Sequence, residues 1–220
     1  MKTDLSGAKL QTIKQINRGM VLQLILKGIR TNRTDISKEL NLTRTTLTNI
    51  VTELMEDGVI AEVPMENKTH TSSGRKSITL DLSKDAPLIC GVMLLRKRLV
   101  VALADMKCNI VQLEEYSYQG VLPLDEMKKA ITDMYSSLER STKKKIAAVG
   151  ISAVGPVDVH QGLILNPHRF YQEDQDFPVV SFMEELTELP CFLSHDVSAG
   201  AIAEHLYGNA TYQNNFVYIS

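Results

Sequence analysis

The chain has 220 residues, of which 44% are hydrophobic and 23% charged, and its formal net charge is −2. This composition excludes a disordered or fibrous protein and supplies enough apolar residues for one large domain or two small ones. The charge is unevenly distributed, because residues 1–82 carry 12 Lys and Arg against 9 Asp and Glu, whereas residues 83–220 carry 12 against 17. Since no aromatic residue precedes Tyr116, the N-terminal part lacks the rings on which single-stranded nucleic acids stack.

Cysteine usage and hydropathy indicate the compartment. Cys90, Cys108 and Cys191 are far apart and form no Cys-x-x-Cys pair, which predicts neither a disulfide framework nor a zinc cluster. The N-terminus has no apolar signal core, and the longest uncharged apolar run, residues 146–157, is too short to span a bilayer. We therefore expect a cytoplasmic protein without a membrane partner.

The first 82 residues predict three helices and a β-hairpin. A helix over residues 20–27 is apolar almost all round and is expected to be buried, ending at Gly28. Thr34 is expected to cap a second helix over 35–40, and Thr43 a third over 44–56. The third helix has an apolar stripe at i, i+3, i+4 and i+7, made by Leu47, Ile50, Val51 and Leu54.

Two strand-like runs, 59–63 and 77–82, flank a polar stretch over 64–76. This order of helices, strands and loop is the layout of a winged helix-turn-helix over residues 1–82, followed by a linker at 83–87. Beyond residue 88 the patterns predict a mixed α/β sheet. Its strands are expected at 88–95, 98–106, 109–118, 145–153, 191–194 and 216–220, its helices at 124–140, 179–188 and 197–207, and a loop at 154–178.

The third helix is the predicted DNA-recognition helix, because burial of its apolar stripe turns a polar face outward. The predicted DNA-binding residues are Arg44, Thr45, Thr46, Thr48 and Asn49 on this helix, Arg33 and Thr34 near phosphate, and Arg75 and Lys76 at the wing tip. Arg can bind guanine and Asn adenine, whereas Thr offers a hydroxyl or a methyl contact. In the alternative interpretation the threonines only cap a helix and the unit contacts another protein.

Two sets of motifs resemble the ROK family (repressors, open reading frames and kinases). The N-terminal set comprises residues 17–22, 40–47, 54–60 and 74–75; the C-terminal set comprises residues 149–158 with Gly162, Ile164 and 166–167, and residues 189–190 and 195–204 with Gly208. The resemblance covers essentially the whole chain. It implies a winged helix-turn-helix followed by the first lobe of an actin-like/ribonuclease H-like domain over 88–220.

Kinases of this family hold ATP on an Asp-x-Gly-Gly-Thr turn, where glycines let backbone amides approach phosphate. Residues 91–97 contain neither the glycine pair nor the aspartate, and Met93 falls roughly where the aspartate would be. Arg96, Lys97 and Arg98 could attract phosphate, but they are expected to form a solvated turn. The resemblance therefore predicts a protein that is not an enzyme.

The resemblance also implies a sugar site made of Gly155, Asn166, His195 and Asp196. Asp196 matches the carboxylate that serves as general base in the kinases and that would accept a hydroxyl hydrogen bond in a repressor. His195 replaces the family's asparagine, which leaves the identity of the sugar open. Alternatively, Asp196 only caps the helix that follows it.

The family's domain normally continues into a second lobe with a zinc-binding Cys/His cluster, so the chain is expected to be a fragment or a shortened gene product, with no cofactor within these residues. The main hypothesis is a dimeric transcriptional repressor of carbohydrate genes that binds a double-stranded DNA operator and responds to a sugar or sugar phosphate. The alternatives are a sugar kinase with an added N-terminal domain and a ligand-independent DNA-binding or dimerisation protein.

Overall fold

The computed structural model describes residues 5–28, 31–64, 78–121, 123–165, 175–208, 210 and 215–219, with side chains from residue 12 onward. The chain divides into two compact units, Met1–Ala86 and Pro87–Ser220, each with its own internal contacts. The division falls inside the stretch 83–87 that the sequence suggests as a linker.

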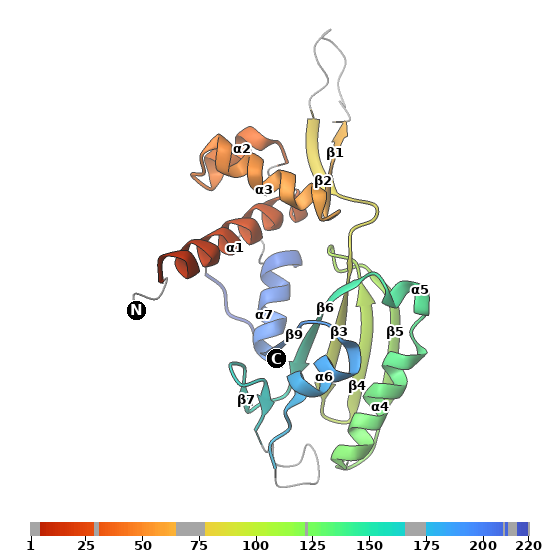
Figure 1. Cartoon of the computed structure of the whole chain (residues 1–220). Coiled ribbons are helices and arrows are strands. Elements are labelled where there is room, and N and C mark those ends of the chain that lie inside the picture. Colours follow the sequence, from red (N-terminus) through yellow and green to blue (C-terminus); the bar gives the residue numbers. More distant parts are fainter. Residues whose placement is uncertain are drawn as a thin grey trace. The chain divides into compact units, whose positions relative to one another are not determined.

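The first unit contains three helices and a two-stranded antiparallel hairpin (Figure 1). The helices are α1 (Leu5–Leu26), α2 (Arg33–Glu39) and α3 (Arg44–Glu56), and the hairpin strands are β1 (Ile60–Pro64) and β2 (Ile78–Leu82). In the hairpin Ile60 pairs with Leu82 and Pro64 with Ile78. The predicted winged helix-turn-helix is confirmed.

Burial in the first unit follows the apolar stripe of α3. Leu47, Ile50, Val51 and Leu54 are all buried, as the i, i+3, i+4, i+7 spacing predicts. The expectation for the first helix is wrong in two respects. α1 begins at Leu5, well before residue 20, and in residues 20–26 only Val21 and Ile25 are fully buried.

The second unit is built on a five-stranded sheet in the order β5-β4-β3-β6-β9. Its strands are β3 (Leu88–Leu95), β4 (Arg98–Ala104), β5 (Ile110–Ser117), β6 (Ile146–Ala153) and β9 (Cys191–His195). β3, β4 and β5 form an antiparallel meander, whereas β6 and β9 run parallel to β3. The predicted mixed α/β sheet is confirmed.

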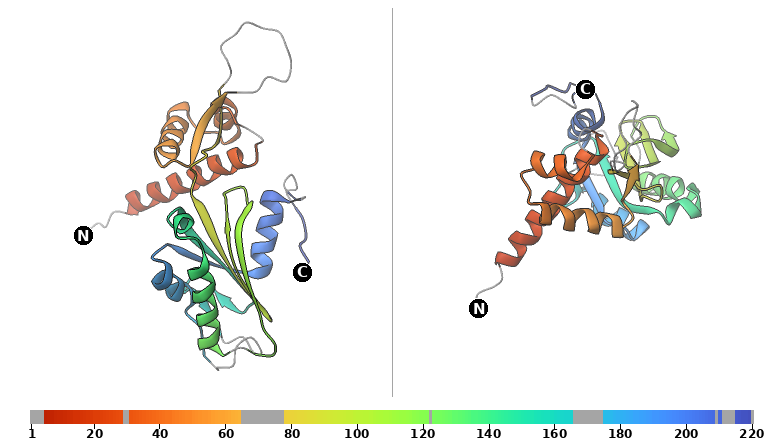
Figure 2. Two further views of the ribbon diagram at one scale, coloured as in Figure 1. Left: turned by 90° about the vertical axis from the view of Figure 1, so that its right-hand side faces the viewer. Right: turned by 90° about the horizontal axis from the view of Figure 1, so that it is seen from above.

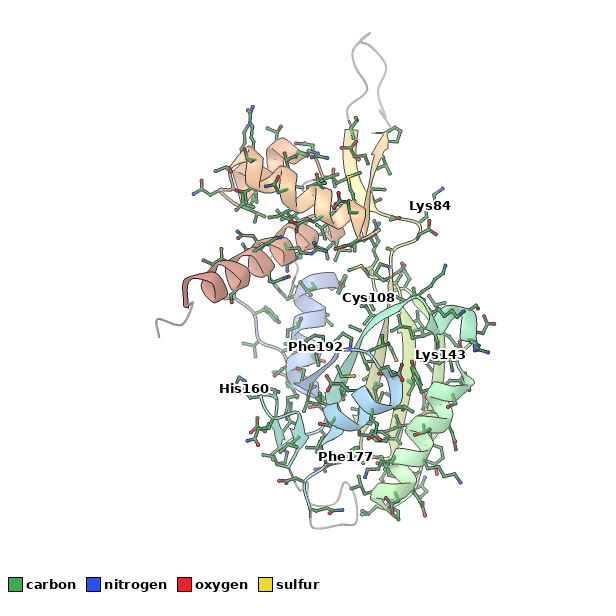
Figure 3. All side chains as sticks on the ribbon, viewed as in Figure 1. Lys84, Cys108, Lys143, His160, Phe177 and Phe192 are labelled. Carbon is green, nitrogen blue, oxygen red and sulfur yellow. The ribbon has the colours of Figure 1, made fainter. Side chains whose placement is uncertain are left out.

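Helices cover both faces of this sheet. α4 (Leu124–Ser137) and α6 (Val179–Thr187) pack on one face, where Met127 and Ile131 join Leu94 and Val101 in the core. α7 (Asp196–Tyr207) lies on the opposite face, and Figure 2 shows it across the sheet from α4. Two phenylalanines mark the contrast in burial, because Phe177 is 0% exposed in the core and Phe192 is 66% exposed on β9 (Figure 3).

Three expectations about the second unit need correction. The helix predicted over 124–140 ends at Ser137, because Leu138 is extended and the Lys143 ammonium, in the short helix α5 (Arg140–Lys143), donates to the carbonyls of Tyr135 and Ser136. The predicted loop 154–178 contains a small hairpin, β7 (Val157–Asp158) with β8 (Leu163–Ile164). The predicted strand 216–220 is wrong for residues 216–219, which form no strand, and Ser220 lies outside the described residues.

Candidate DNA-binding surface and ligand pocket

The start of α3 is fixed by the Thr43 side chain. Thr43 is the predicted N-cap, and its Oγ1 accepts a hydrogen bond from the Thr46 amide at 3.1 Å. Together with the buried stripe, this cap sets the rotation of the helix, so that Arg44, Thr45, Thr48 and Asn49 are exposed. Thr46 differs from its prediction, because it is half-buried and its hydroxyl lies 2.8 Å from that of Thr43. Four of the five predicted side chains on α3 therefore form an exposed polar surface.

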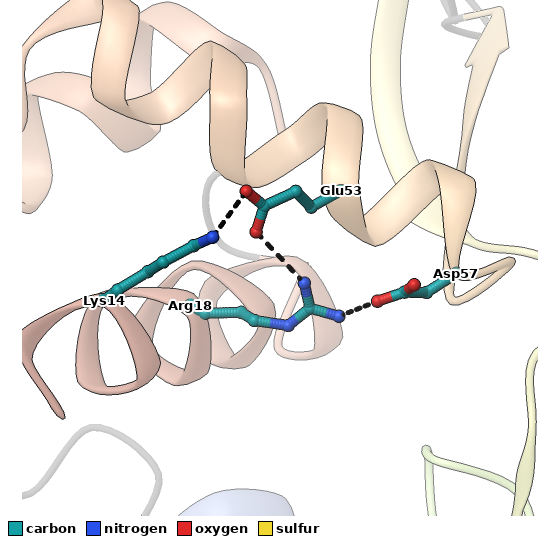
Figure 4. Close-up of polar contacts among 4 residues, drawn as sticks. All are labelled: Lys14, Arg18, Glu53 and Asp57. Atoms are coloured by element: carbon teal, nitrogen blue, oxygen red, sulfur yellow. Dashed lines mark hydrogen bonds and ion pairs between the residues drawn. The ribbon is translucent and has the colours of Figure 1, made fainter. Parts of the chain in front are cut away.

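Four charged side chains hold α1 against α3, as Figure 4 shows. The Lys14 ammonium lies 2.7 Å from one Glu53 oxygen, and the Arg18 guanidinium lies 3.6 Å from the other. Arg18 also donates to the Asp57 carboxylate at the C-terminal end of α3. Arg18 is the most enclosed of the four, with 23% of its side chain exposed. This network holds α1 against α3. No local pattern in the sequence predicts it, because the partners are 35 or more residues apart.

The other predicted DNA contacts have mixed outcomes. Arg33 pairs with Glu62 of the wing at 2.9 Å, so a phosphate contact by Arg33 would have to compete with this ion pair. Thr34 is exposed but does not cap α2, because Asn32 is the N-cap and its Oδ1 accepts the Asp35 amide at 2.9 Å. An Asn three residues before an Asp was the available signal. Arg75 and Lys76 lie outside the described residues.

In the second unit, Gly155, His195 and Asp196 meet at the C-terminal ends of the parallel strands β6 and β9. A Cβ on Gly155 would lie 2.5 Å from His195 Nε2, so glycine leaves room for the imidazole ring. On its other side, His195 Nδ1 lies 2.8 Å from Asp196 Oδ1. Three of the four predicted sugar-site residues are thus adjacent, whereas Asn166 lies outside the described residues.

Asp196 is also the first residue of α7, and its side chain contacts a free amide at the start of that helix. His195 is the N-cap, and the Val197 amide lies 3.3 Å from His195 Nδ1 and 2.8 Å from Asp196 Oδ1. Capping and ligand contact are compatible roles for this residue, because a carboxylate has a second oxygen that can accept further hydrogen bonds.

A pocket of about 350 Å³ adjoins this helix start. It is lined by Met93, Leu95, Ser152, Asp196, Val197, Ala199, Gly200, Ala203 and Tyr218. Most of this lining is apolar, and its polar groups are the Asp196 carboxylate and the hydroxyls of Ser152 and Tyr218. An apolar cavity with a few convergent polar groups is the usual form of a small-molecule site. Ser152 and Tyr218 were not predicted as site residues, because only the fold brings them beside Asp196.

The wall that α7 contributes is anchored at the far end of the helix. The Tyr207 hydroxyl donates to the Met106 carbonyl at 3.1 Å, in the turn between β4 and β5. Burial, followed by the neighbouring Cys108 and Asp105, raises the pKa of Tyr207 to about 12, so the hydroxyl stays a donor at neutral pH. Near the C-terminus, the Phe216 ring stacks on His205 with 5.8 Å between centroids.

Neither a metal centre nor a membrane segment is found in the described part of the chain. No group of three or more His, Cys, Asp or Glu there could hold a metal ion. None of the described helices is both long and apolar enough to cross a bilayer.

A three-helix unit with a wing, followed by a mixed sheet with a pocket beside α7, defines the class as a two-unit winged-helix protein. Comparison with known proteins identifies both parts. The model for the ROK family matches residues 90–220, and a model for winged helix-turn-helix DNA-binding domains matches residues 15–61. The chain belongs to the ROK family.

Similar proteins include two that are named as repressors. The chain is 26% identical to the xylose repressor of Caldicellulosiruptor bescii over 94% of its own length and 52% of that protein. It is 27% identical to the DNA-binding transcriptional repressor Mlc of Escherichia coli, over 89% of the chain and 48% of Mlc. The chain therefore spans about half the length of these relatives. It also superimposes on a crystal structure of a ROK family transcriptional regulator, a homologue of E. coli Mlc, with a TM-score of 0.70. The two are 24% identical over 89% of this chain and 49% of that structure. This similarity supports the fold.

Proposed function

We propose that the chain acts as a sequence-specific DNA-binding transcriptional repressor of carbohydrate-metabolism genes whose operator affinity responds to a sugar. The observation that carries this proposal is the capped, exposed recognition helix in the same chain as a pocket that contains a carboxylate. The names of the relatives support it, since two of them are a xylose repressor and the repressor Mlc.

On DNA, α3 would enter the major groove with its N-terminal turn facing the bases. Arg44 is placed to bind guanine and Asn49 adenine, while Thr45 and Thr48 add hydroxyl and methyl contacts. Arg33 would leave Glu62 for a phosphate at small cost, because an exposed ion pair contributes only about 0–1 kcal/mol. A homodimer would bind a palindromic operator whose two half-sites are separated by about 10 base pairs or a multiple of that spacing.

In the second unit, Asp196 would accept a hydrogen bond from a sugar hydroxyl. The arrangement does not favour phosphoryl transfer, because Met93 and Leu95 give the pocket an apolar wall at the end of β3, and the Asp-x-Gly-Gly-Thr motif is absent from residues 91–97. We therefore propose a ligand sensor and not an enzyme.

One observation favours the ligand-independent alternative. The Val197 amide, which donates to Asp196 Oδ1 at 2.8 Å, already satisfies one carboxylate oxygen within the protein. Calorimetric titration with a panel of monosaccharides and their phosphates separates the two proposals. Retained DNA binding without heat from any sugar would favour the constitutive protein.

Titration of the whole chain with fluorescent duplexes from the promoter beside its own gene tests the DNA-binding proposal. We expect tighter binding to one duplex than to a scrambled control, with an affinity that falls steeply as salt rises. Arg44→Ala should weaken specific binding by about 1–3 kcal/mol and relax the preference at one base pair. Arg140→Ala, which removes an exposed cation from α5, is the matched control. Equal binding to all duplexes at every salt concentration would refute the proposal.

A further inference from the structure

A groove of about 370 Å³ lies between α1 and α3 in the first unit. Its lining residues on α1 are Ile13, Lys14 and Asn17, and those on α3 include Thr46, Asn49 and Glu53. We propose that this groove takes a phosphate of the DNA backbone, with the Lys14 ammonium and the Asn17 amide as donors. This inference rests on the proposed function, because it adds contacts from α1 to the DNA interface of the same unit.

The groove is continuous with the exposed polar surface of α3, because the two share Asn49. Thr46, Asn49 and Glu53 recur every three or four residues, so they lie on one flank of the helix. With 3.6 residues per turn, this flank is about a third of a turn away from the buried stripe that begins at Leu47. It therefore adjoins the exposed face that carries Thr45, and the groove borders the surface that is expected to read the bases.

A recognition helix in the major groove has a phosphate strand along each of its flanks. The major groove of B-DNA is about 12 Å wide, and a helix with its side chains is about 10–12 Å across, so little space separates the helix from either strand. On the flank toward α1, the strand would meet the groove that Lys14 and Asn17 line. Ammonium and amide groups are both common donors to DNA phosphates, so the chemistry of this lining fits the strand.

Lys14 can donate to a phosphate without leaving Glu53. Figure 4 shows the Lys14 ammonium reaching from α1 to Glu53 on α3, where it lies 2.7 Å from Oε1. An ammonium has three donors, and 52% of the Lys14 side chain is exposed, so donors remain for an incoming oxygen. The Glu53 carboxylate alone would repel a phosphate on this flank. The paired ammonium therefore makes the flank acceptable to DNA.

Binding of the whole chain to fluorescent duplexes over a range of salt concentrations tests the inference. The probes are the promoter duplex and its scrambled control, and either can report the contact, because a phosphate carries no sequence information. We expect Lys14→Gln to weaken binding to both duplexes by the same factor, about five- to tenfold at low salt. The slope of log affinity against log salt concentration should become shallower by about 0.9, the value for one lost phosphate contact.

Three further variants separate a phosphate contact from a structural role. Asn17→Ala removes a neutral donor and should weaken binding to both duplexes about two- to fivefold with an unchanged salt slope. Glu53→Gln removes the carboxylate that repels the phosphate and should tighten binding to both duplexes about threefold. Lys84→Gln, which removes an exposed cation from the turn after β2, is the matched control for net charge and should leave the slope unchanged. Thermal melting checks that every variant is folded.

The outcomes distinguish this inference from the proposed function. If Lys14→Gln changes the salt slope no more than Lys84→Gln does, or if Glu53→Gln weakens binding, the inference is overturned and the ion pair only holds α1 against α3. If the chain binds both duplexes equally while Lys14→Gln still lowers the slope, the proposed repressor function is wrong and the phosphate contact stands. If the chain binds neither duplex, both are wrong.

Discussion

Removal of the Thr43 hydroxyl should loosen the first turn of the recognition helix. Thr43→Val keeps the shape of the side chain and deletes the oxygen that accepts the Thr46 amide at 3.1 Å. Backbone strain does not complicate the change, because Thr43 is extended, with φ −65° and ψ 152°, a conformation that valine readily adopts. Thr43→Ser keeps the acceptor and is the matched control.

The expected loss is that of one N-cap hydrogen bond, about 1 kcal/mol within a range of about 0.5–2 kcal/mol. The Thr46 hydroxyl, 2.8 Å from Thr43 Oγ1, adds little, because Thr43 is exposed and water can replace it as a partner. A loss of 1 kcal/mol corresponds to about a fivefold increase in the population of the open first turn.

Amide hydrogen exchange measures this opening directly. Protection of the Thr46 amide should fall about fivefold in Thr43→Val and stay unchanged in Thr43→Ser. The Asp35 amide, which Asn32 caps on α2, is an internal reference. Operator affinity should fall by a similar factor, because the turn that carries Arg44 must be ordered on DNA. Equal protection of Thr46 in Thr43→Val and in the wild-type protein would refute the capping argument.

Three other changes test the packing and the charges of the two units. Gly162→Ala should destabilise the second unit by about 2–4 kcal/mol, because φ is +71° and the new Cβ would lie 2.6 Å from the Val180 Cβ. Gly120→Ala, with φ +76° and open space around the new Cβ, should reduce stability by only about 1 kcal/mol. Urea unfolding followed by tyrosine fluorescence reports on the second unit, because all tyrosines lie at or beyond residue 116. Equal losses of stability in the two variants would contradict the clash with Val180. Asp158 should titrate below an ordinary aspartate in carboxyl NMR, because hydrogen bonds, first of all the one from the Gln161 amide, lower its pKa. The ionised carboxylate then stabilises the β7–β8 turn above about pH 4, and this stabilisation is lost as the pH falls through the lowered pKa. Asp158→Asn should remove this pH dependence. Arg18→Gln should reduce stability by about 0.5–1.5 kcal/mol, and Lys14→Gln, at a more exposed site, should reduce it by less. Thermal melting measures both losses. A larger loss in Lys14→Gln would contradict the role of Arg18 in holding α1 against α3.

The local signals that predicted elements correctly were complete within a few residues. Thr43 and the stripe from Leu47 to Leu54 defined α3 at both ends, because the cap and the helical period lie within the helix and the residue before it. The strands from β3 to β6 were found to within a few residues for the same reason. The start of α1 was missed, because the side chains of residues 12–16 are all exposed and leave no buried stripe there to reveal the helix.

Errors arose where contacts from elsewhere decide the outcome. Residues 216–219 have the composition of a strand, but pairing needs a partner, and in the described part of the chain they instead place Tyr218 against Gly200 of α7. α4 ends early because Lys143, in the next helix, donates to its last carbonyls. Neither partner can be read from the segment itself.

The sequence by itself determined the two units, the recognition helix with its outward polar face, and the family, because each of these depends on short-range pattern and spacing. Only the tertiary structure placed Gly155 against His195 and brought Ser152 and Tyr218 beside Asp196. Strand order and register decide which side chains share a face, and they follow from the packing of the whole sheet.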